Sequence, residues 1–218
     1  MNETTKRSDQ RIRILSAARE LIETNQLSMR NLAKQANVGH VTPYKLFKSK
    51  QDVIVAVANE EISEFQDKLS ELHSQDALDR ILDSIRLTNL FLIERESLYK
   101  AVVMFQMFGD QSANEDINGP RRAAWVQMIQ DAVSDGFLEE VASIEDIVNN
   151  IFYINYGALT DWSRGLIKNE QMNAAVGFGI VLSILGIATR KGRKRLDAEL
   201  DLYIRALADS RGNASGHR

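Results

Sequence analysis

The sequence has no cysteine, and it contains only three histidines and two prolines among 218 residues. Without cysteine, the chain can form no disulfide, no thiolate metal site and no cysteine nucleophile. The histidines, His40, His73 and His217, have no carboxylates beside them at the spacing of metal ligands. A nucleophile elbow and a phosphate-binding glycine loop are also missing. We therefore expect no enzymatic activity, no cofactor and no metal site.

Long apolar runs are also missing. The longest nearly uninterrupted one covers residues 174–188 and includes Gly177, Gly179, Ser183 and Gly186. A membrane-spanning helix needs roughly 20 apolar residues, so this run is better interpreted as a buried helix. The first thirteen residues have no apolar segment and do not resemble a signal peptide. We expect a cytoplasmic protein that has no membrane partner.

Apolar residues recur at helical spacing along most of the chain, and few segments have the alternation of a strand. The hydrophobic content of 44% is enough for a substantial core. We predict an all-α fold of about nine to ten helices. It would consist of an N-terminal three-helix module with a helix-turn-helix, followed by a larger helical domain. Among the predicted helices are residues 10–24, ended by a left-handed Asn25, and residues 144–167 and 170–190, the last with the basic residues 190–195 at its C-terminal end. Residues 109–120 are predicted to form a polar loop, with Pro120 at the start of a helix that Asp135 and Gly136 end.

Residues 28–47 carry the pattern of a helix-turn-helix. Ser28 is a good N-cap, and the apolar residues after it predict a short helix that Asn37 ends in a left-handed conformation. A second short helix follows over residues 40–47, with exposed basic and aromatic side chains. Because such a unit presents its second helix to the DNA major groove, the pattern predicts sequence-specific binding to double-stranded DNA. The alternative is a helical hairpin in an all-α core that binds no nucleic acid.

This N-terminal stretch resembles the TetR family of bacterial transcription regulators. The resemblance rests on ILSAARELIETN, MRNLAKQANV and TPYKLFKSKQDVIVAVANE, between about Arg11 and Glu60. It implies a homodimeric regulator, in most cases a repressor that a small molecule releases from a palindromic operator. Asn37, Gly39 and Pro43 depart from the usual pattern of the family, so the base preference cannot be taken from its relatives.

Charge is unevenly distributed along the chain. Residues 1–50 contain ten Lys and Arg and four Asp and Glu, a net charge of +6, so the remaining residues must carry −9 to reach the total of −3. A basic module on an acidic body concentrates the attraction for phosphate in one place. Base contacts are expected from the first part of the second helix, and phosphate contacts from its aromatic and basic neighbours. The predicted DNA-binding residues are Arg30, His40, Val41, Thr42, Tyr44, Lys45, Lys48 and Lys50.

We expect the DNA-binding domain to cover residues 8–68 and a helical effector-binding and dimerisation domain to cover residues 69–209. Residues 1–7 and 210–218 are expected to be disordered tails. Lys6 and Arg7 would then form a basic arm that reaches a neighbouring groove, or a solvated tail without a role. One helix from about Lys50 to Ser70 would belong to both domains.

The predicted effector pocket combines aromatic and Met side chains with a few polar groups, the mixture that orients a largely apolar ligand. Its candidate residues are Arg86, Asn89, Met104, Phe105, Phe108, Trp125, Met128, Phe152, Asn155, Tyr156 and Trp162. The alternative for these residues is plain core packing. Gly179, Ser183 and Gly186 place small residues along one helix, which favours a four-helix dimer interface, with packing inside one chain as the alternative. The alternative function is a dimeric DNA-binding regulator without a small-molecule effector, which a protein partner controls or which acts as an activator. An all-α enzyme or scaffold is the third.

Overall fold

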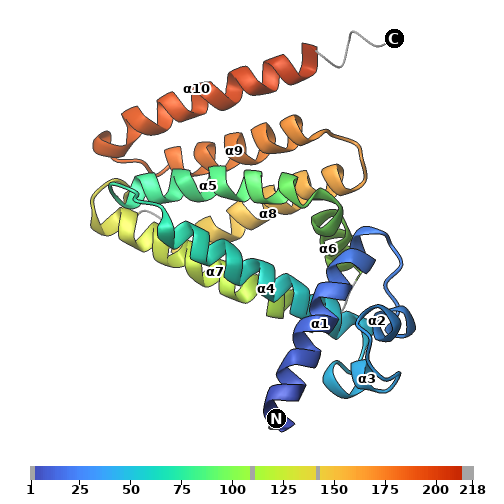
Figure 1. Cartoon of the computed structure of the whole chain (residues 1–218). Helices are drawn as coiled ribbons and strands as arrows, with labels where there is room; N and C mark the ends of the chain where they lie inside the picture. Colours follow the sequence, from blue (N-terminus) through green and yellow to red (C-terminus); the bar gives the residue numbers. More distant parts are fainter. Residues whose placement is uncertain (1–2, 109–110, 141–142, 213–218) are drawn as a thin grey trace. The chain divides into compact units, whose positions relative to one another are not determined.

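The computed structural model describes residues 3–108, 111–140 and 143–212, and it contains ten α-helices within those ranges. Within those ranges, Leu138 and Ala188 form an isolated antiparallel β-bridge. The prediction of an all-α fold is therefore confirmed. The chain divides into two compact units (Figure 1), and each is described by itself.

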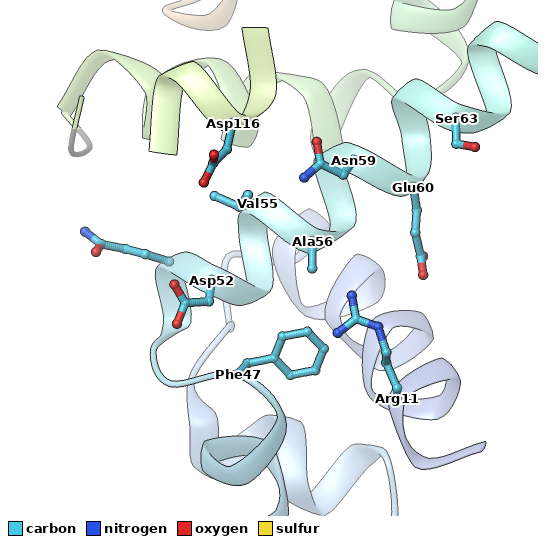
Figure 2. Close-up of a pocket in the computed structure, with 10 residues that line it drawn as sticks. Arg11, Phe47, Asp52, Val55, Ala56, Asn59, Glu60, Ser63 and Asp116 are labelled. Carbon is cyan, nitrogen blue, oxygen red and sulfur yellow. The ribbon is translucent and has the colours of Figure 1, made fainter. Parts of the chain in front are cut away.

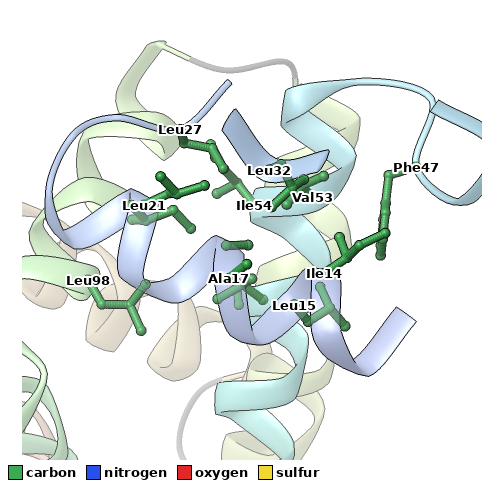
Figure 3. Packing of buried hydrophobic residues seen from close by; sticks show 14 of the residues in the cluster. Ile14, Leu15, Ala17, Leu21, Leu27, Leu32, Phe47, Val53, Ile54 and Leu98 are labelled. Atoms are coloured by element: carbon green, nitrogen blue, oxygen red, sulfur yellow. The ribbon is translucent and has the colours of Figure 1, made fainter. Parts of the chain in front are cut away.

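The first unit comprises residues 1–66 and 95–119. It contains α1 (Glu3–Glu23), α2 (Met29–Gln35), α3 (Thr42–Leu46), most of α4 (Lys50–Glu71), all of α6 (Glu96–Phe108) and the start of α7 (Gln111–Ser134). Its core joins Ile14, Leu32 and Val53 to Leu98 and Ile117 (Figure 3). A segment distant in the sequence therefore completes the N-terminal module.

Helix α1 begins earlier than the sequence pattern predicts. We expected a start at Gln10 and a disordered segment over residues 1–7, but the helix starts at Glu3. Residues 3–9 contain neither glycine nor proline, so nothing in them interrupts the backbone hydrogen bonds of the following turns. At the other end of the chain, α10 (Arg190–Gly212) includes the first three residues, 210–212, of the predicted C-terminal tail.

Helix α7 corrects a second expectation. Residues 109–120 were predicted to form a loop with Pro120 at the start of a helix, whereas α7 starts at Gln111 and contains Pro120 within it. Proline has no N–H, so the carbonyl of Asp116 loses one helical bond. Burial of Ile117, which is 2% exposed in the core of the first unit, compensates for that loss.

The second unit comprises residues 67–94 and 120–218. It contains α5 (Ala77–Glu94), most of α7, α8 (Ile144–Ser163), α9 (Asn169–Leu185) and α10, and α9 packs against α5, α8 and α10. A Cβ atom on Gly177 would overlap the ring of Tyr203 in α10. A Cβ atom on Gly179 would lie 2.6 Å from Ile154 Cγ2 in α8. The glycines of α9 therefore allow its neighbours to approach closely within one chain.

Two helix ends in this unit differ from the prediction. Helix α8 was expected to reach Ile167, but it ends at Ser163 because Gly165 takes a left-handed conformation with φ of 72°. Helix α9 was expected to reach Arg190, but it ends at Leu185. The next residues pair with another segment instead, since Glu139 N donates to Ile187 O at 2.8 Å.

The basic segment 190–195 therefore opens α10 instead of closing α9. Its cations still contact carbonyl groups at helix ends, as Arg193 Nη2 donates to Leu185 O of α9 at 3.3 Å and Lys191 Nζ donates to Asp135 O after α7 at 2.8 Å. Arg195 pairs with Asp76 and Asp79. These contacts hold the start of α10 and offset carbonyl dipoles at the ends of the neighbouring helices.

Within the described ranges, no helix combines the length and apolarity that crossing a bilayer requires.

Candidate nucleic-acid interface

Local hydrogen bonds define the turn between α2 and α3. The Ser28 side chain accepts from Asn31 N at 3.1 Å, which confirms the predicted N-cap of α2. Asn37 has a φ of 50°, and Val38 N donates to Ala33 O at 3.0 Å. The left-handed asparagine thus turns the chain toward α3, as the sequence predicts.

Helix α3 is short, and proline suits its place in it. Pro43 is the second residue of the helix, where its missing N–H would have no helical partner. The sequence pattern placed it near the fourth residue. The Pro43 carbonyl accepts from Phe47 N at 2.7 Å, and both side chains are buried. These buried residues attach α3 to the module and leave its other side free.

The exposed side of α3 carries most of the predicted base contacts. His40, Val41, Tyr44 and Lys45 are exposed, with exposed fractions of 61% for Val41 and 56% for Tyr44. Thr42 is half-buried. An exposed valine and tyrosine beside a basic side chain suit a surface that contacts bases and phosphates.

The predicted phosphate contacts surround this helix. Lys48 and Lys50 are exposed on both sides of Ser49, which forms a capping box with Asp52: Ser49 N donates to Asp52 Oδ2 at 3.0 Å, and Asp52 N donates to Ser49 Oγ at 3.1 Å. The box fixes the first turn of α4 and the direction of the two lysines. On α2, Arg30 is exposed, as predicted.

The structure also brings two residues to this surface that the sequence analysis did not select. Lys34 is exposed in the last turn of α2, one turn after Arg30. The Arg11 guanidinium lies over the Phe47 ring at 4.8 Å from its centroid. The i, i+4 spacing of Arg30 and Lys34 is a sequence signal that places Lys34 on the same face of α2 as Arg30. No local signal connects Arg11 to Phe47.

A hollow of about 500 Å³ opens beside Arg11 and Phe47 (Figure 2). Val55 and Ala56 of α4 form an apolar wall of the hollow, and the polar rim of the hollow includes Asp52, Glu60 and Asp116. The hollow lies within the first unit. It was not predicted, since its walls come from α1, α4 and α7.

A buried carboxylate connects three helices of the first unit. The Glu61 side chain of α4 is 2% exposed and accepts from Arg19 Nε of α1 at 2.9 Å, while Arg95 Nε, just before α6, lies 3.4 Å from its other oxygen. Burial by itself lowers the pKa of Arg19, but the Glu61 hydrogen bond and the nearby carboxylates outweigh it and raise the pKa. Glu61 therefore links α1, α4 and the start of α6.

The sequence contained a signal for this connection that was not used. Glu61 follows Ile54 and Val57 at helical spacing, so it occupies a position of the apolar stripe of α4. A charge at such a position indicates a buried ionic partner, because an unpaired buried charge is costly.

The residues of the predicted effector pocket are distributed over both units. Met104 and Phe105 belong to the first unit, where Phe105 packs against the N-terminal core. The Phe108 side chain lies outside the described residues. The other residues belong to the second unit, and Tyr156 among them is 51% exposed.

Several of these side chains have partners within the second unit. Arg86 Nη2 donates to Glu199 Oε2 at 2.6 Å, and Trp162 Nε1 donates to Asn169 Oδ1 at 2.6 Å. Asn155 Nδ2 donates to Ile151 O of its own helix at 3.0 Å. Asn89 Nδ2 lies 3.4 Å from a backbone oxygen of α9, and Asn89 Oδ1 has no hydrogen-bond partner among the residues that the structure describes.

The remaining pocket candidates differ in their environment. Met128 is 5% exposed and Trp125 is half-buried on α7. Phe152 is 9% exposed, and the guanidinium groups of Arg121 and Arg122 lie over its ring at 5.4 and 4.3 Å. A separate hollow of about 400 Å³ between α8, α9 and α10 is not lined by the predicted residues. The location of an effector pocket stays a prediction.

The residues predicted for a dimer interface make contacts within the chain. Gly179 faces Ile154, Asn150 Nδ2 donates to Ser183 Oγ at 2.9 Å, and Gly186 is the C-cap of α9. Exposed apolar side chains remain beside them, with exposed fractions of 72% for Tyr153 and 47% for Leu182. The described residues contain no group of three or more His, Cys, Asp or Glu that could hold a metal ion.

Comparison with known families supports the assignment of the N-terminal module. Residues 14–57 match the family described as bacterial regulatory proteins, tetR family. A comparison with curated proteins finds no match.

Solved structures share the fold over most of the chain. A TetR transcriptional regulator from Rhodococcus sp. RHA1 is 19% identical with a TM-score of 0.66, covering 84% of this chain and 100% of that one. FadR from Thermus thermophilus, a repressor in complex with lauroyl-CoA, is 16% identical with a TM-score of 0.67, covering 83% and 96%. FadR from Bacillus subtilis in complex with stearoyl-CoA is 19% identical with a TM-score of 0.65, covering 81% and 98%.

Proposed function

Because residues 14–57 belong to the tetR family of bacterial regulatory proteins and the chain has the fold of TetR-family regulators, we propose that it is a homodimeric, DNA-binding repressor. A small, largely apolar effector would release it from a palindromic operator. The observation that carries the proposal is the exposed surface of α3, with Val41 and Tyr44 projecting from a helix that Pro43 and Phe47 attach to the module. Since its ligand is chromosomal DNA, the protein would act in the cytoplasm.

The exposed side chains divide into two roles. His40, Val41, Thr42 and Lys45 would contact base edges, through hydrogen bonds or through contact with a thymine methyl group. Tyr44, Lys48, Lys50 and Arg30 would contact phosphates, which set the position of the module on the duplex without specifying sequence. The net charge of +6 on residues 1–50 supports this division, because phosphate attraction needs a concentrated positive charge.

Two copies would pair through the exposed face of α8 and α9. Tyr153, Tyr156 and Leu182 expose apolar surface there, and no atom of the described residues lies within 4 Å of where a Cβ atom of Gly157 would be. In the proposed dimer, these residues pack on their symmetry mates. A twofold axis would then place two α3 helices in successive major grooves, roughly 34 Å apart.

The effector would act by shifting a population of conformations. Helix α4 is continuous from Lys50 to Glu71 and, like α7, contains residues of both units. Because it begins directly after α3, it is the element through which we expect the second unit to act on α3. In the proposed dimer, the two DNA-binding modules can adopt more than one spacing. A ligand with a higher affinity for one spacing shifts the population toward it, and the operator affinity can change by at most the ratio of the ligand's affinities for the two spacings. The lauroyl-CoA and stearoyl-CoA complexes of similar structures make long-chain acyl-CoA the first effector class to test.

The test starts with selection of bound sequences from random duplex DNA by the full-length protein. We expect a palindromic site, and a Tyr44→Ala variant should bind it more weakly with a smaller salt dependence. The control is Leu202→Ala, which removes an exposed apolar side chain from α10, outside the proposed DNA and dimer contacts. Failure of the wild-type protein to bind any duplex in a salt-dependent way would refute the proposal.

Addition of an acyl-CoA to the complex distinguishes the two forms of the proposal. Release of the duplex supports the effector-controlled repressor. Retention of the duplex with a broad panel of apolar ligands favours a regulator without a small-molecule effector, which a partner protein would control.

A further inference from the structure

The first three turns of α1 extend beyond the core of the first unit. The helix begins at Glu3, but Ile14 is its first buried residue, and the side chains of residues 5–9 and 11–13 are exposed. This segment contains Lys6, Arg7, Arg11 and Arg13. A helix that projects without an apolar face gains little from packing, so its basic side chains call for another explanation.

The direction of these side chains follows from helical geometry. Arg7 and Arg11 are four residues apart, and the same row continues through Leu15 and Ala18, which are buried in the core. Arg7 and Arg11 therefore lie on the side of α1 that faces the rest of the module. Asp9 lies roughly 200° around the helix from Arg7, on the opposite side, but it is within one turn of Lys6, and Glu3 lies one turn before Arg7 in the same row.

The Arg11 contact fixes this side relative to α3. Its guanidinium covers the ring of Phe47, which is the C-cap of α3. Figure 1 shows the first turns of α1 at the same end of the module as α3. Arg7 lies one turn nearer the N-terminus than Arg11, so it extends past the end of α3 instead of packing over the core.

We propose that Lys6 and Arg7 form a second DNA contact, to phosphates that flank the groove occupied by α3. The proposal rests on the DNA binding proposed above. From Arg11 to Lys6 the helix advances about 7.5 Å, at 1.5 Å per residue, which corresponds to about two base pairs of duplex. Because the segment is helical, the two cations are held in place and lose less conformational freedom on binding than they would on a disordered arm.

The partner is double-stranded DNA and the contact is to phosphate. Lys6 and Arg7 are long cationic side chains without an apolar neighbour that could wedge between bases, so the contact adds affinity and footprint without base preference. It would add to the major-groove contacts of α3 and to the phosphate contacts of Lys48 and Lys50.

The experiment compares Lys6→Gln/Arg7→Gln with wild-type protein on two duplexes. Both contain the selected site; one ends at the last base that α3 contacts, and the other continues for eight base pairs on each side. On the longer duplex, we expect the double variant to bind on the order of 10- to 100-fold more weakly near 50 mM salt. Its salt slope should fall by about 0.9 for each lost phosphate contact, or about 2 per protomer. On the shorter duplex, the two proteins should bind alike.

An Arg190→Gln/Lys194→Gln variant is the control for net charge, since both side chains are exposed in the second unit. Equal binding of wild-type protein and the Lys6/Arg7 variant to the longer duplex, with Tyr44→Ala still weakened, would overturn the flanking contact and leave the proposed function intact. An equal loss on both duplexes, or an equal loss in the control, would also overturn it. Absence of salt-dependent binding by the wild-type protein would instead refute the DNA binding on which it rests.

Discussion

Replacement of Glu61 by glutamine should loosen the first unit far more than replacement of its neighbour Glu60. The Glu61 side chain is 2% exposed and contacts both Arg19 and Arg95. The Glu60 side chain is 40% exposed, and within the described residues it forms a salt bridge with Arg19 alone. Removal of one partner from a buried ionic contact typically costs about 3–5 kcal/mol, because the other charge is left uncompensated. An exposed pair contributes about 0.2–1 kcal/mol.

We expect the lower end of the first range for Glu61→Gln. Arg19 keeps Glu60 at 2.8 Å, and Arg95 keeps Glu64 at 2.5 Å, so each cation retains one carboxylate. The expected cost is about 3 kcal/mol, against at most about 1 kcal/mol for Glu60→Gln. Since 1.4 kcal/mol is a tenfold change in an opening equilibrium, the two variants should differ in local opening by on the order of 30-fold.

Hydrogen exchange measured by mass spectrometry on the full chain can report this difference. Peptides from α1 and α6 should exchange on the order of 100-fold faster in Glu61→Gln and no more than about fivefold faster in Glu60→Gln. Peptides from α9 belong to the second unit and serve as the internal reference. Equal acceleration of α1 and α6 by both substitutions would show that Glu61 does not connect these helices.

Three further predictions concern the second unit. Burial alone raises the pKa of Asp76, but the Arg195 hydrogen bond, with further hydrogen bonds and the Arg195 charge, outweighs it and lowers the pKa. The pair therefore stabilises the fold above about pH 4 and loses that effect as the pH falls through the folded-state pKa. Urea titrations should show Asp76→Asn costing less stability at pH 3 than at pH 6. Gly177→Ala should destabilise the packing of α10 by about 1–3 kcal/mol, because the new Cβ atom overlaps Tyr203, and hydrogen exchange should show less protection of α10. The double variant with Tyr203→Ala should recover part of that protection. Unchanged protection in the single variant would mean that α9 and α10 can separate freely. Gly157→Arg should leave the helical circular dichroism unchanged but convert a dimer to a monomer in sedimentation, and a variant that stays dimeric would exclude this face of α8.

The parts of the fold that the sequence predicted correctly are those that single residues decide. Asn25 and Asn37 both have positive φ, and Gly136 ends α7 in the same way, because the preference for a left-handed conformation belongs to the residue itself. The Ser28 cap is equally local. Such features depend on a few neighbouring atoms, so the sequence states them directly.

The parts that the sequence did not predict depend on contacts between distant segments. Pro120 lies within a helix because Ile117 is buried by the N-terminal core, and α9 ends early because residues 187–189 pair with residues 137–139. Within the interface, the exposed residues of α3 could be chosen from their types and positions. The contact of Arg11 with Phe47 and the burial of Glu61 need three-dimensional neighbours that no local pattern contains.

The discontinuous first unit also constrains how the protein is made. Its core includes Leu98, Val102 and Ile117, so the unit cannot bury its full apolar surface until residue 119 has left the ribosome. At about 5–20 residues per second, synthesis of the 53 residues from 67 to 119 takes roughly 3–10 s. During that interval, residues 1–66 present α1 and α4 with part of their apolar faces uncovered and Glu61 without Arg95. A chain that ends before residue 119 would therefore present the proposed DNA-binding surface on an incompletely packed core, at a stage when only residues 67–94 of the second unit have been translated.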